Sequence, residues 1–249
     1  MHSIRSLALL TLLLSVTGGV FSQTPPEPAY YSRLNTFGIF AEYSNDSSHM
    51  VVGSAENRKL LDFGGTYSRR VLLNRFVDGQ YMLELQPIML ESDPVYHITY
   101  QDTLPPPATT VTVNNTYAQA CKPATLTFNG EIGGTQYAET ETIACGRRWV
   151  FGQGFAPAGF KFNFRPRHRI QPVFAVLGGY MFTTQPIPVA DAGSWNFTLE
   201  VGAGFEFYRS GTRSIRAEYR IHHISNDHTA TENPGIDSGL FQVTYAFGR

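Results

Sequence analysis

The chain has 249 residues and a formal net charge of −1, a balance that gives no reason to expect a nucleic-acid partner. Aromatic residues make up 13% of the chain, charged residues only 16%, and 23 residues are glycine, a composition that favours short alternating strands over helices. Beyond the first 22 residues, no segment is a continuous apolar span that would predict a membrane helix. The length suits one domain of barrel or sandwich size.

Residues 1–22 have the pattern of a secretory signal. A weakly basic start is followed by an apolar core over residues 7–20, and cleavage is expected after Ser22. A membrane-anchoring helix is the alternative. However, the apolar core is shorter than the roughly 20 residues that a span needs, and Gly18 and Gly19 interrupt it. We therefore predict that the mature chain is exported.

The chain contains two cysteines, Cys121 and Cys145. Export would place them in an oxidising compartment, so we expect a disulfide that stabilises the fold by on the order of 3 kcal/mol. A metal site built on the two thiolates is the alternative, but the intervening stretch offers no histidine as a further ligand.

Alternation of apolar and polar residues predicts eight strands in the mature chain. The expected ranges are 35–44, 59–69, 79–90, 149–164, about 174–182, 195–207, 215–225 and 237–247. Short turns and long loops alternate between these strands, as they do in outer-membrane barrels.

Two stretches lack the alternation. Residues 23–33 are rich in proline and predict a loose periplasmic leader. Residues 92–148 hold three consecutive prolines, a run rich in threonine and asparagine, and both cysteines. We expect this stretch to be a long irregular surface loop tied down by the disulfide, not a second domain.

Side-chain parity favours a membrane barrel. One face of the predicted strands is aromatic and aliphatic, and the charged residues fall on the other; these are Glu42, Asp62, Glu84, Lys161, Glu200, Glu206, Arg216, Glu218 and Arg220. A soluble lipocalin-like barrel or a β-sandwich has the same periodicity, but it would turn its charges toward water and keep its interior apolar. We therefore predict an all-β fold: an eight-stranded antiparallel transmembrane β-barrel of the bacterial outer membrane, with about 92–148 as an extracellular loop.

The last predicted hairpin carries a candidate catalytic site. Because residues two apart on a strand share a face, His223 and Ser225 end the apolar face of one strand, and Asp237 begins the apolar face of the next. Residues two apart lie about 6.6–6.8 Å from each other, and neighbouring strands lie about 4.8 Å apart. Ser225 as nucleophile, His223 as base and Asp237 as the residue that orients the imidazole would form an acyl-transfer triad. Asn226 and the backbone N–H groups after it are the expected donors to an oxyanion.

An even strand count that starts in the periplasm places this cluster at the outer rim of the barrel. The cluster shares the apolar face, so it would face the membrane and not the lumen. A nucleophile in that place can reach only lipids, and the outer leaflet of such a membrane is lipopolysaccharide. The expected substrate class is therefore lipid.

The run from His223 to Asn226 (His-Ile-Ser-Asn), followed by Asn233 to Asp237 (Asn-Pro-Gly-Ile-Asp), resembles the PagL-type lipid A 3-O-deacylases, which are eight-stranded outer-membrane barrels. The resemblance implies hydrolysis of the ester-linked 3-hydroxyacyl chain at the 3-position of lipid A by a Ser/His/acid triad, with no metal or other cofactor. It also implies an oxyanion or substrate-binding role for Asn233. Two positions depart from the family pattern: the acid is Asp237 where the family has the longer Glu, and His228 replaces a glycine of the oxyanion hole.

The same features allow a second function, because a barrel without catalytic activity could serve adhesion or envelope structure through its disulfide-tied loop. His222 is expected in a lumen charge network, although His222, Asp227 and His228 together could be imagined as metal ligands. Arg147 and Arg148 are either solvated rim charges or contacts for lipid A phosphates. The sequence does not indicate an oligomeric state.

Overall fold

The computed structural model describes residues 29–44, 46–102 and 109–249. The predicted signal sequence and the first part of the predicted leader lie outside the described residues. In the part of the chain that is described, no helix is long and apolar enough to cross a membrane.

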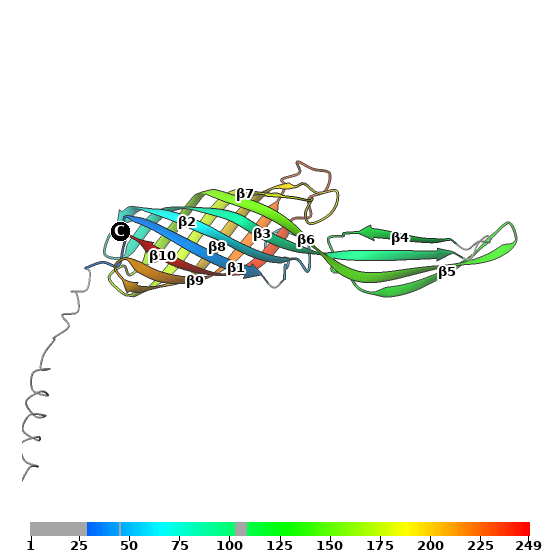
Figure 1. Ribbon diagram of the computed structural model, residues 1–249, viewed down its shortest axis with the longest axis horizontal. Helices are drawn as coiled ribbons and strands as arrows, with labels where there is room; N and C mark the ends of the chain where they lie inside the picture. The colour runs from blue at the N-terminus through cyan, green and yellow to red at the C-terminus, as the bar shows by residue number, and fades with distance from the viewer. Residues whose placement is uncertain (1–28, 45, 103–108) are drawn as a thin grey trace, which may run out of the picture.

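The described residues form ten β-strands in one antiparallel sheet (Figure 1). In chain order the strands are β1 (Asn35–Ser44), β2 (Lys59–Leu73), β3 (Val77–Asp102), β4 (Thr110–Asn115), β5 (Ala124–Ile132), β6 (Thr135–Phe164), β7 (Ile170–Thr183), β8 (Trp195–Ser210), β9 (Arg213–Ser225) and β10 (Ile236–Gly248). The sheet order is β4-β3-β2-β1-β10-β9-β8-β7-β6-β5, and a further pairing of β3 with β6 closes a ring of eight strands. The predicted eight-stranded barrel is confirmed, and each predicted strand lies within one strand of this ring.

The two ends of the barrel differ in their connections. At one end, the turn end, β2 joins β3, β6 joins β7 and β8 joins β9 through short turns, and β1 begins where β10 ends. The other end, the loop end, carries the connections 45–58, 184–194 and 226–235. This alternation of short turns and long loops follows the predicted pattern.

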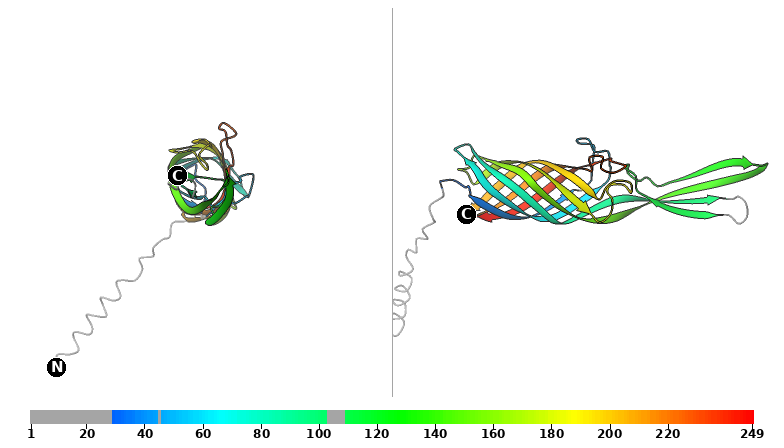
Figure 2. Two further views of the ribbon diagram at one scale, coloured as in Figure 1. Left: turned by 90° about the vertical axis from the view of Figure 1, so that its right-hand side faces the viewer. Right: turned by 90° about the horizontal axis from the view of Figure 1, so that it is seen from above.

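The segment 92–148 is largely sheet, so the prediction of an irregular loop there is wrong. β3 and β6 stay paired beyond the barrel as far as Asp102 and Glu139, and β4 and β5 add one strand on either side. The four strands form an extension that projects from the loop end (Figure 2). The prediction followed the proline and cysteine content of the connections, whereas the β-branched run Thr110 to Val113 favours a strand.

Cys121 and Cys145 form the predicted disulfide, with their Cα atoms 5.8 Å apart. Cys145 lies on β6 opposite Tyr96 of β3, whereas Cys121 lies in the connection between β4 and β5. The bond therefore ties this connection to the base of the extension.

The two faces of the barrel wall are divided as the alternation predicted. Large apolar side chains point outward, and Ile39 and Tyr219 are 64% and 57% exposed. The charged residues of the other face are all buried in the barrel interior; these are Glu42, Asp62, Glu84, Lys161, Glu200, Glu206, Arg216, Glu218 and Arg220. A barrel in lipid needs this arrangement, because hydrocarbon surrounds the outer face and cannot solvate charge.

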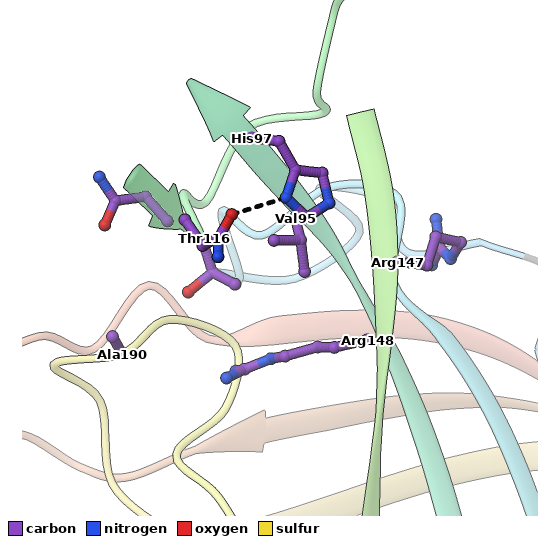
Figure 3. A pocket seen from close by; sticks show the side chains of 8 residues that line it. Val95, His97, Thr116, Arg147, Arg148 and Ala190 are labelled. Carbon is purple, nitrogen blue, oxygen red and sulfur yellow. Dashed lines mark hydrogen bonds between the residues drawn. The ribbon is translucent and has the colours of Figure 1, made fainter. Parts of the chain in front are cut away.

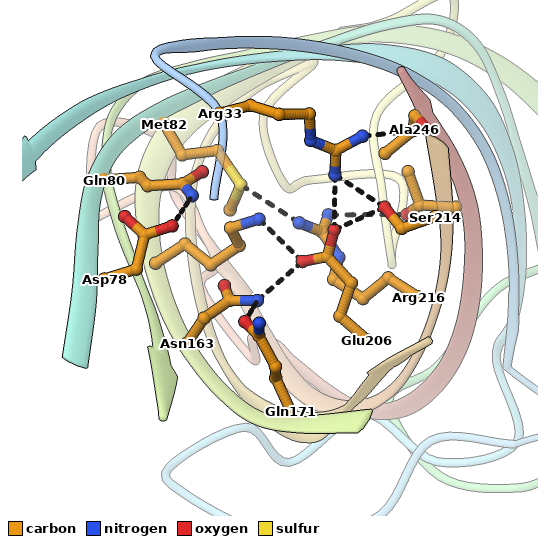
Figure 4. A network of polar contacts seen from close by, with 12 residues as sticks. Arg33, Asp78, Gln80, Met82, Asn163, Gln171, Glu206, Ser214, Arg216 and Ala246 are labelled. Atoms are coloured by element: carbon orange, nitrogen blue, oxygen red, sulfur yellow. Dashed lines mark hydrogen bonds and ion pairs between the residues drawn. The ribbon is translucent and has the colours of Figure 1, made fainter. Parts of the chain in front are cut away.

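A buried polar network fills the barrel interior near the turn end (Figure 4). The Oε1 atom of Glu206 accepts hydrogen bonds from Arg33 at 2.7 Å and from Ser214 at 2.5 Å. Its Oε2 atom accepts from Lys161 at 2.9 Å and from Asn163 at 2.8 Å. Two cations thus share one carboxylate, and the interior is held together by charge-assisted hydrogen bonds.

Arg33 belongs to the stretch predicted as a loose leader, and that prediction is wrong for its last residues. Tyr31 and Arg33 are buried. The N–H of Tyr31 donates to the carbonyl of Pro166 at 2.7 Å, and Nη1 of Arg33 donates to the carbonyl of Ala246 at 3.1 Å. The leader is fixed here because its guanidinium is a cationic partner of the buried Glu206 carboxylate.

We predict that Glu206→Gln destabilises the barrel by about 3–5 kcal/mol, because Arg33 and Lys161 then remain buried without their shared counter-charge. Equilibrium unfolding in urea, followed by circular dichroism in detergent, measures the loss. Glu131→Gln removes an exposed carboxylate from the extension and is the matched control, for which no change is expected. Equal stability of Glu206→Gln and the wild type would contradict this account of the interior.

Candidate active site

The hairpin of β9 and β10 brings two of the predicted residues together. In the strand register, Asp237 lies directly opposite His223. The Nδ1 atom of His223 lies 2.6 Å from Oδ1 of Asp237. The shorter acid therefore reaches the imidazole, because the two residues are direct cross-strand neighbours.

Ser225 lies two residues beyond His223, at the end of β9. Its hydroxyl donates to Oδ1 of Asn233 at 3.1 Å and accepts from Nδ2 of Asn233 at 3.0 Å. The backbone N–H of Asp227 also donates to Ser225 Oγ, at 3.2 Å. Among the contacts of the described residues there is no hydrogen bond between Ser225 and His223. Catalytic hydrogen bonds are often long or misaligned before substrate binds.

The turn after Ser225 has an unusual backbone. The N–H of Thr229 donates to the carbonyl of Asn226 at 3.0 Å, and the two residues between them have positive φ, 51° for Asp227 and 59° for His228. Positive φ at both central positions is the pattern of a type I′ turn, for which Asn, Asp and Gly are preferred. His228 therefore adopts the left-handed conformation that a glycine would take without strain.

Asn226 holds this turn in place. Its side chain accepts from the N–H of His228 at 2.9 Å and donates to the carbonyl of Glu232 at 2.7 Å. Its own N–H donates to Oδ1 of Asn233 at 3.1 Å. Asn226 is buried, so its side chain organises the loop, whereas the side chain of Asn233 and the N–H of Asp227 are the donors in contact with the serine.

The cluster faces outward. His223 has 17% of its side chain exposed, and the residues paired with His223 and Ser225 on β8 are Leu199 and Phe197, both of which are exposed. The neighbouring His222 is fully buried in the barrel, with Nε2 3.8 Å from Oε1 of Glu200. The predicted lumen position of His222 is thus confirmed. In the described residues, no group of three or more His, Cys, Asp or Glu could hold a metal ion.

Sequence reasoning missed two partners of Asp237. Its second carboxylate oxygen, Oδ2, accepts hydrogen bonds from the backbone N–H groups of Val51, at 2.6 Å, and Gly53, at 2.9 Å. Both residues lie in the connection between β1 and β2, one of the long loops of the predicted alternation. Backbone donors leave no mark in residue type, so no sequence signal pointed to them.

The same connection contains an exposed ion pair. The Nε2 atom of His49 lies 3.0 Å from Oε1 of Glu56, and Nδ1 lies 2.9 Å from the carbonyl oxygen of Gly53. The hydrogen bond to Glu56, reinforced by the Gly53 carbonyl, raises the pKa of His49, and the same bond lowers the pKa of Glu56. The stability that this His49–Glu56 contact adds through the raised pKa of His49 is therefore present at low pH. It is lost as the pH rises through that pKa.

Arg147 and Arg148 lie at the loop end, where Arg147 is exposed and Arg148 is partly buried, and both have protein partners. They lie at the base of the extension, beside an open hollow that is also lined by His97, Thr116 and Ala190 (Figure 3). Arg147 donates to the Ser92 carbonyl at 2.6 Å, and Arg148 pairs with Asp93 at 2.9 Å. Both guanidinium groups therefore join segments of the loop end to each other.

The fold and the site together define a class: a β-barrel of the outer-membrane type with a His–Asp pair and a serine on its outward rim. A model of the family described as lipid A 3-O-deacylase (PagL) matches residues 100–246. The chain belongs to this family, whose members act on lipid A, and the family points to the bacterial outer membrane. Among curated proteins, none matches the chain.

Two solved structures are similar to this chain in fold. Neisserial surface protein A (NspA) has 11% sequence identity to this chain and a TM-score of 0.43. The match covers 86% of this chain and 97% of the NspA chain. The outer membrane protein OprG from Pseudomonas aeruginosa has 10% sequence identity to this chain and a TM-score of 0.37. The match covers 87% of this chain and 98% of the OprG chain.

We predict that His228→Gly stabilises the protein by up to about 1 kcal/mol, because glycine takes the left-handed conformation without the strain that a Cβ adds. Urea unfolding in detergent measures the change. Thr229→Gly, at the next position of the turn, relieves no positive φ and is expected to be neutral or destabilising. A loss of stability in His228→Gly would show that the imidazole, and not the backbone, holds the turn.

Proposed function

We propose that this protein hydrolyses the ester bond of the 3-hydroxyacyl chain at the 3-position of lipid A, with Ser225 as nucleophile, His223 as general base and Asp237 as the orienting acid. The observation that carries the proposal is the 2.6 Å contact between Nδ1 of His223 and Oδ1 of Asp237, on the outward face of the rim. If Nδ1 carries the proton in this contact, Nε2 is left as an acceptor, which is the tautomer that a base needs.

The surroundings of the site favour a lipid substrate. Exposed apolar side chains, among them Phe197, Leu199 and Phe241, lie on the same outward face. An open hollow lined by Met50, Tyr219 and Phe241 lies beside the hairpin on this face. A lipid whose acyl chains lie along such a surface would bring its ester bond to the rim, where the loop end meets the head groups.

The reaction follows from the side chains at the rim. Ser225 turns its hydroxyl from Asn233 to His223, gives its proton to Nε2 and attacks the ester carbonyl carbon. Nδ2 of Asn233 and the N–H of Asp227, which contact Ser225 Oγ, are the proposed donors to the resulting oxyanion. Collapse of this intermediate breaks the ester C–O bond, and His223 returns the proton to the sugar oxygen that leaves. Water, deprotonated by His223, then attacks the carbonyl carbon of the acyl-enzyme. The bond from this carbon to Ser225 Oγ breaks, His223 returns the proton to Oγ, and the fatty acid leaves. In this scheme Asn226 holds the turn that aims the Asp227 N–H.

We predict that expression in a Gram-negative host removes one 3-hydroxyacyl chain from each modified lipid A molecule, as measured by mass spectrometry of extracted lipid A. Ser225→Ala is expected to lower the rate by about 10⁴-fold or more, because the residual activity of a triad without its nucleophile is that small. Ser210→Ala, an exposed serine at the turn end, is the matched control and is expected to retain full activity.

Unchanged lipid A with the wild-type protein, both in cells and with purified protein on lipid A in detergent micelles, would overturn the proposal. The detergent assay removes the possibility that an intact membrane keeps the enzyme latent. That outcome would favour the second function considered from the sequence, a non-catalytic barrel in adhesion or envelope structure, for which the four-stranded extension offers a surface beyond the membrane.

A further inference from the structure

The connection between β1 and β2 folds back over the start of β10 instead of extending outward. Residues 46–58, here called the covering loop, form a bridge between Ser47 and Ser238 and a second bridge between Ala55 and Ile236. The N–H of Ser48 also donates to the carbonyl of Asp237 at 2.8 Å. The covering loop is thus hydrogen-bonded to the backbone on both sides of Asp237.

The covering loop also fixes the carboxylate itself. Oδ2 of Asp237 accepts from the N–H groups of Val51 and Gly53, whereas Oδ1 faces Nδ1 of His223. Two donors on one oxygen restrict rotation of the carboxylate, so the other oxygen stays directed at the imidazole. Asp237 is completely buried under the loop, and this excludes water that would compete for the same oxygens.

Gly53 permits this close approach. A Cβ atom at Gly53 would lie 2.8 Å from the backbone nitrogen of Asp237, 2.9 Å from the carbonyl carbon of Ile236 and 3.0 Å from Cγ of Asp237. Side chains do not tolerate such distances to backbone atoms, so any other residue at position 53 must move either the covering loop or Asp237.

The covering loop is in turn held by the disulfide-tied segment between β4 and β5. The N–H of Glu56 donates to the carbonyl of Ala118 at 2.7 Å, and Oε2 of Glu56 accepts from the N–H of Ala120 at 3.1 Å. The buried guanidinium of Arg58 donates to the carbonyls of Tyr117, at 2.5 Å, and Ala118, at 2.6 Å. These contacts connect the covering loop to the segment that the Cys121 disulfide fixes.

We infer that the covering loop is a positioning element of the proposed reaction, in which the backbone N–H groups of Val51 and Gly53 hold Asp237 in the orientation that aligns His223. The inference rests on the proposed function. Val51 and Gly53 are positioning residues, because they touch Asp237 and not the reacting atoms. Both lie outside residues 100–246, the part of the chain that matches the family.

We predict that Gly53→Ala lowers kcat on lipid A in detergent micelles by on the order of 10²-fold, with little change in KM, since a misplacement of about 1 Å in a catalytic group has an effect of that size. Gly65→Ala on β2 is the matched control, because its Cβ would meet only the carbonyl oxygen of Gly38, at 3.6 Å. Heat-dependent gel mobility establishes that each variant has folded.

A second pair of variants tests the N–H donors directly. Val51→Pro removes the N–H that lies 2.6 Å from Asp237, whereas Val52→Pro removes an N–H that has no hydrogen-bond partner among the described residues. Both side chains are exposed, so neither change removes packing. Val51→Pro is expected to lower kcat, and Val52→Pro is expected to leave it near the wild-type value.

The Asp237→Asn background separates positioning from general damage. If the covering loop acts through the Asp237 carboxylate, Gly53→Ala lowers kcat much less in Asp237→Asn than in the wild type. Equal fold-losses in the two backgrounds, or an unchanged kcat in Gly53→Ala and Val51→Pro, would overturn the inference while the wild type and Ser225→Ala still support the proposed function. An inactive wild type would instead overturn the proposed function itself.

Discussion

A strand in a closed barrel can turn a side chain only inward or outward, and this constraint decides the surroundings of every residue in the ring of strands. His222 and His223 are neighbours in the chain, yet one is buried beside Glu200 in the lumen and the other lies on the outward face beside Asp237. Hydrocarbon outside the barrel requires that all backbone groups of the ring are paired and that charges turn inward. His223 is therefore an exception to the rule that ionisable side chains turn inward. Its acidic partner, Asp237, lies on the adjacent strand.

The two ends of the barrel use buried polar groups differently. At the turn end, Glu206 gathers Arg33 and Lys161 into a compact network that fills the lumen and fixes the N-terminal segment. At the loop end, the buried carboxylates of Asp237 and Asp93 hold loops against the rim. Charge-assisted hydrogen bonds give stability in the first case and a defined arrangement of the rim in the second. The proposed catalytic residues thus stand on the barrel wall, and Asp237 is covered by a loop that is itself anchored.

The sequence was sufficient for the ring of strands and for the direction of its side chains, because a period of two residues is a local property that each strand carries by itself. It was also sufficient to bring His223 and Asp237 to the same rim, since hairpin strands pair with their neighbours. The sequence was insufficient wherever contacts between distant parts of the chain determine the structure. Strands β4 and β5 depend on the prolonged pairing of β3 and β6, and the Arg33 position depends on a carboxylate 173 residues away. The backbone donors of Val51 and Gly53 are invisible in residue type.

The central claim is that Ser225 is a nucleophile activated by His223 at the membrane-facing rim. The most direct test is labelling of the detergent-solubilised protein with a long-chain alkyl fluorophosphonate, which forms a stable adduct with an activated serine, followed by mass spectrometry of the peptides. The account predicts an adduct on Ser225 in the wild type that is absent from His223→Ala. An unlabelled Ser225 in the wild type, or equal labelling in His223→Ala, would contradict it.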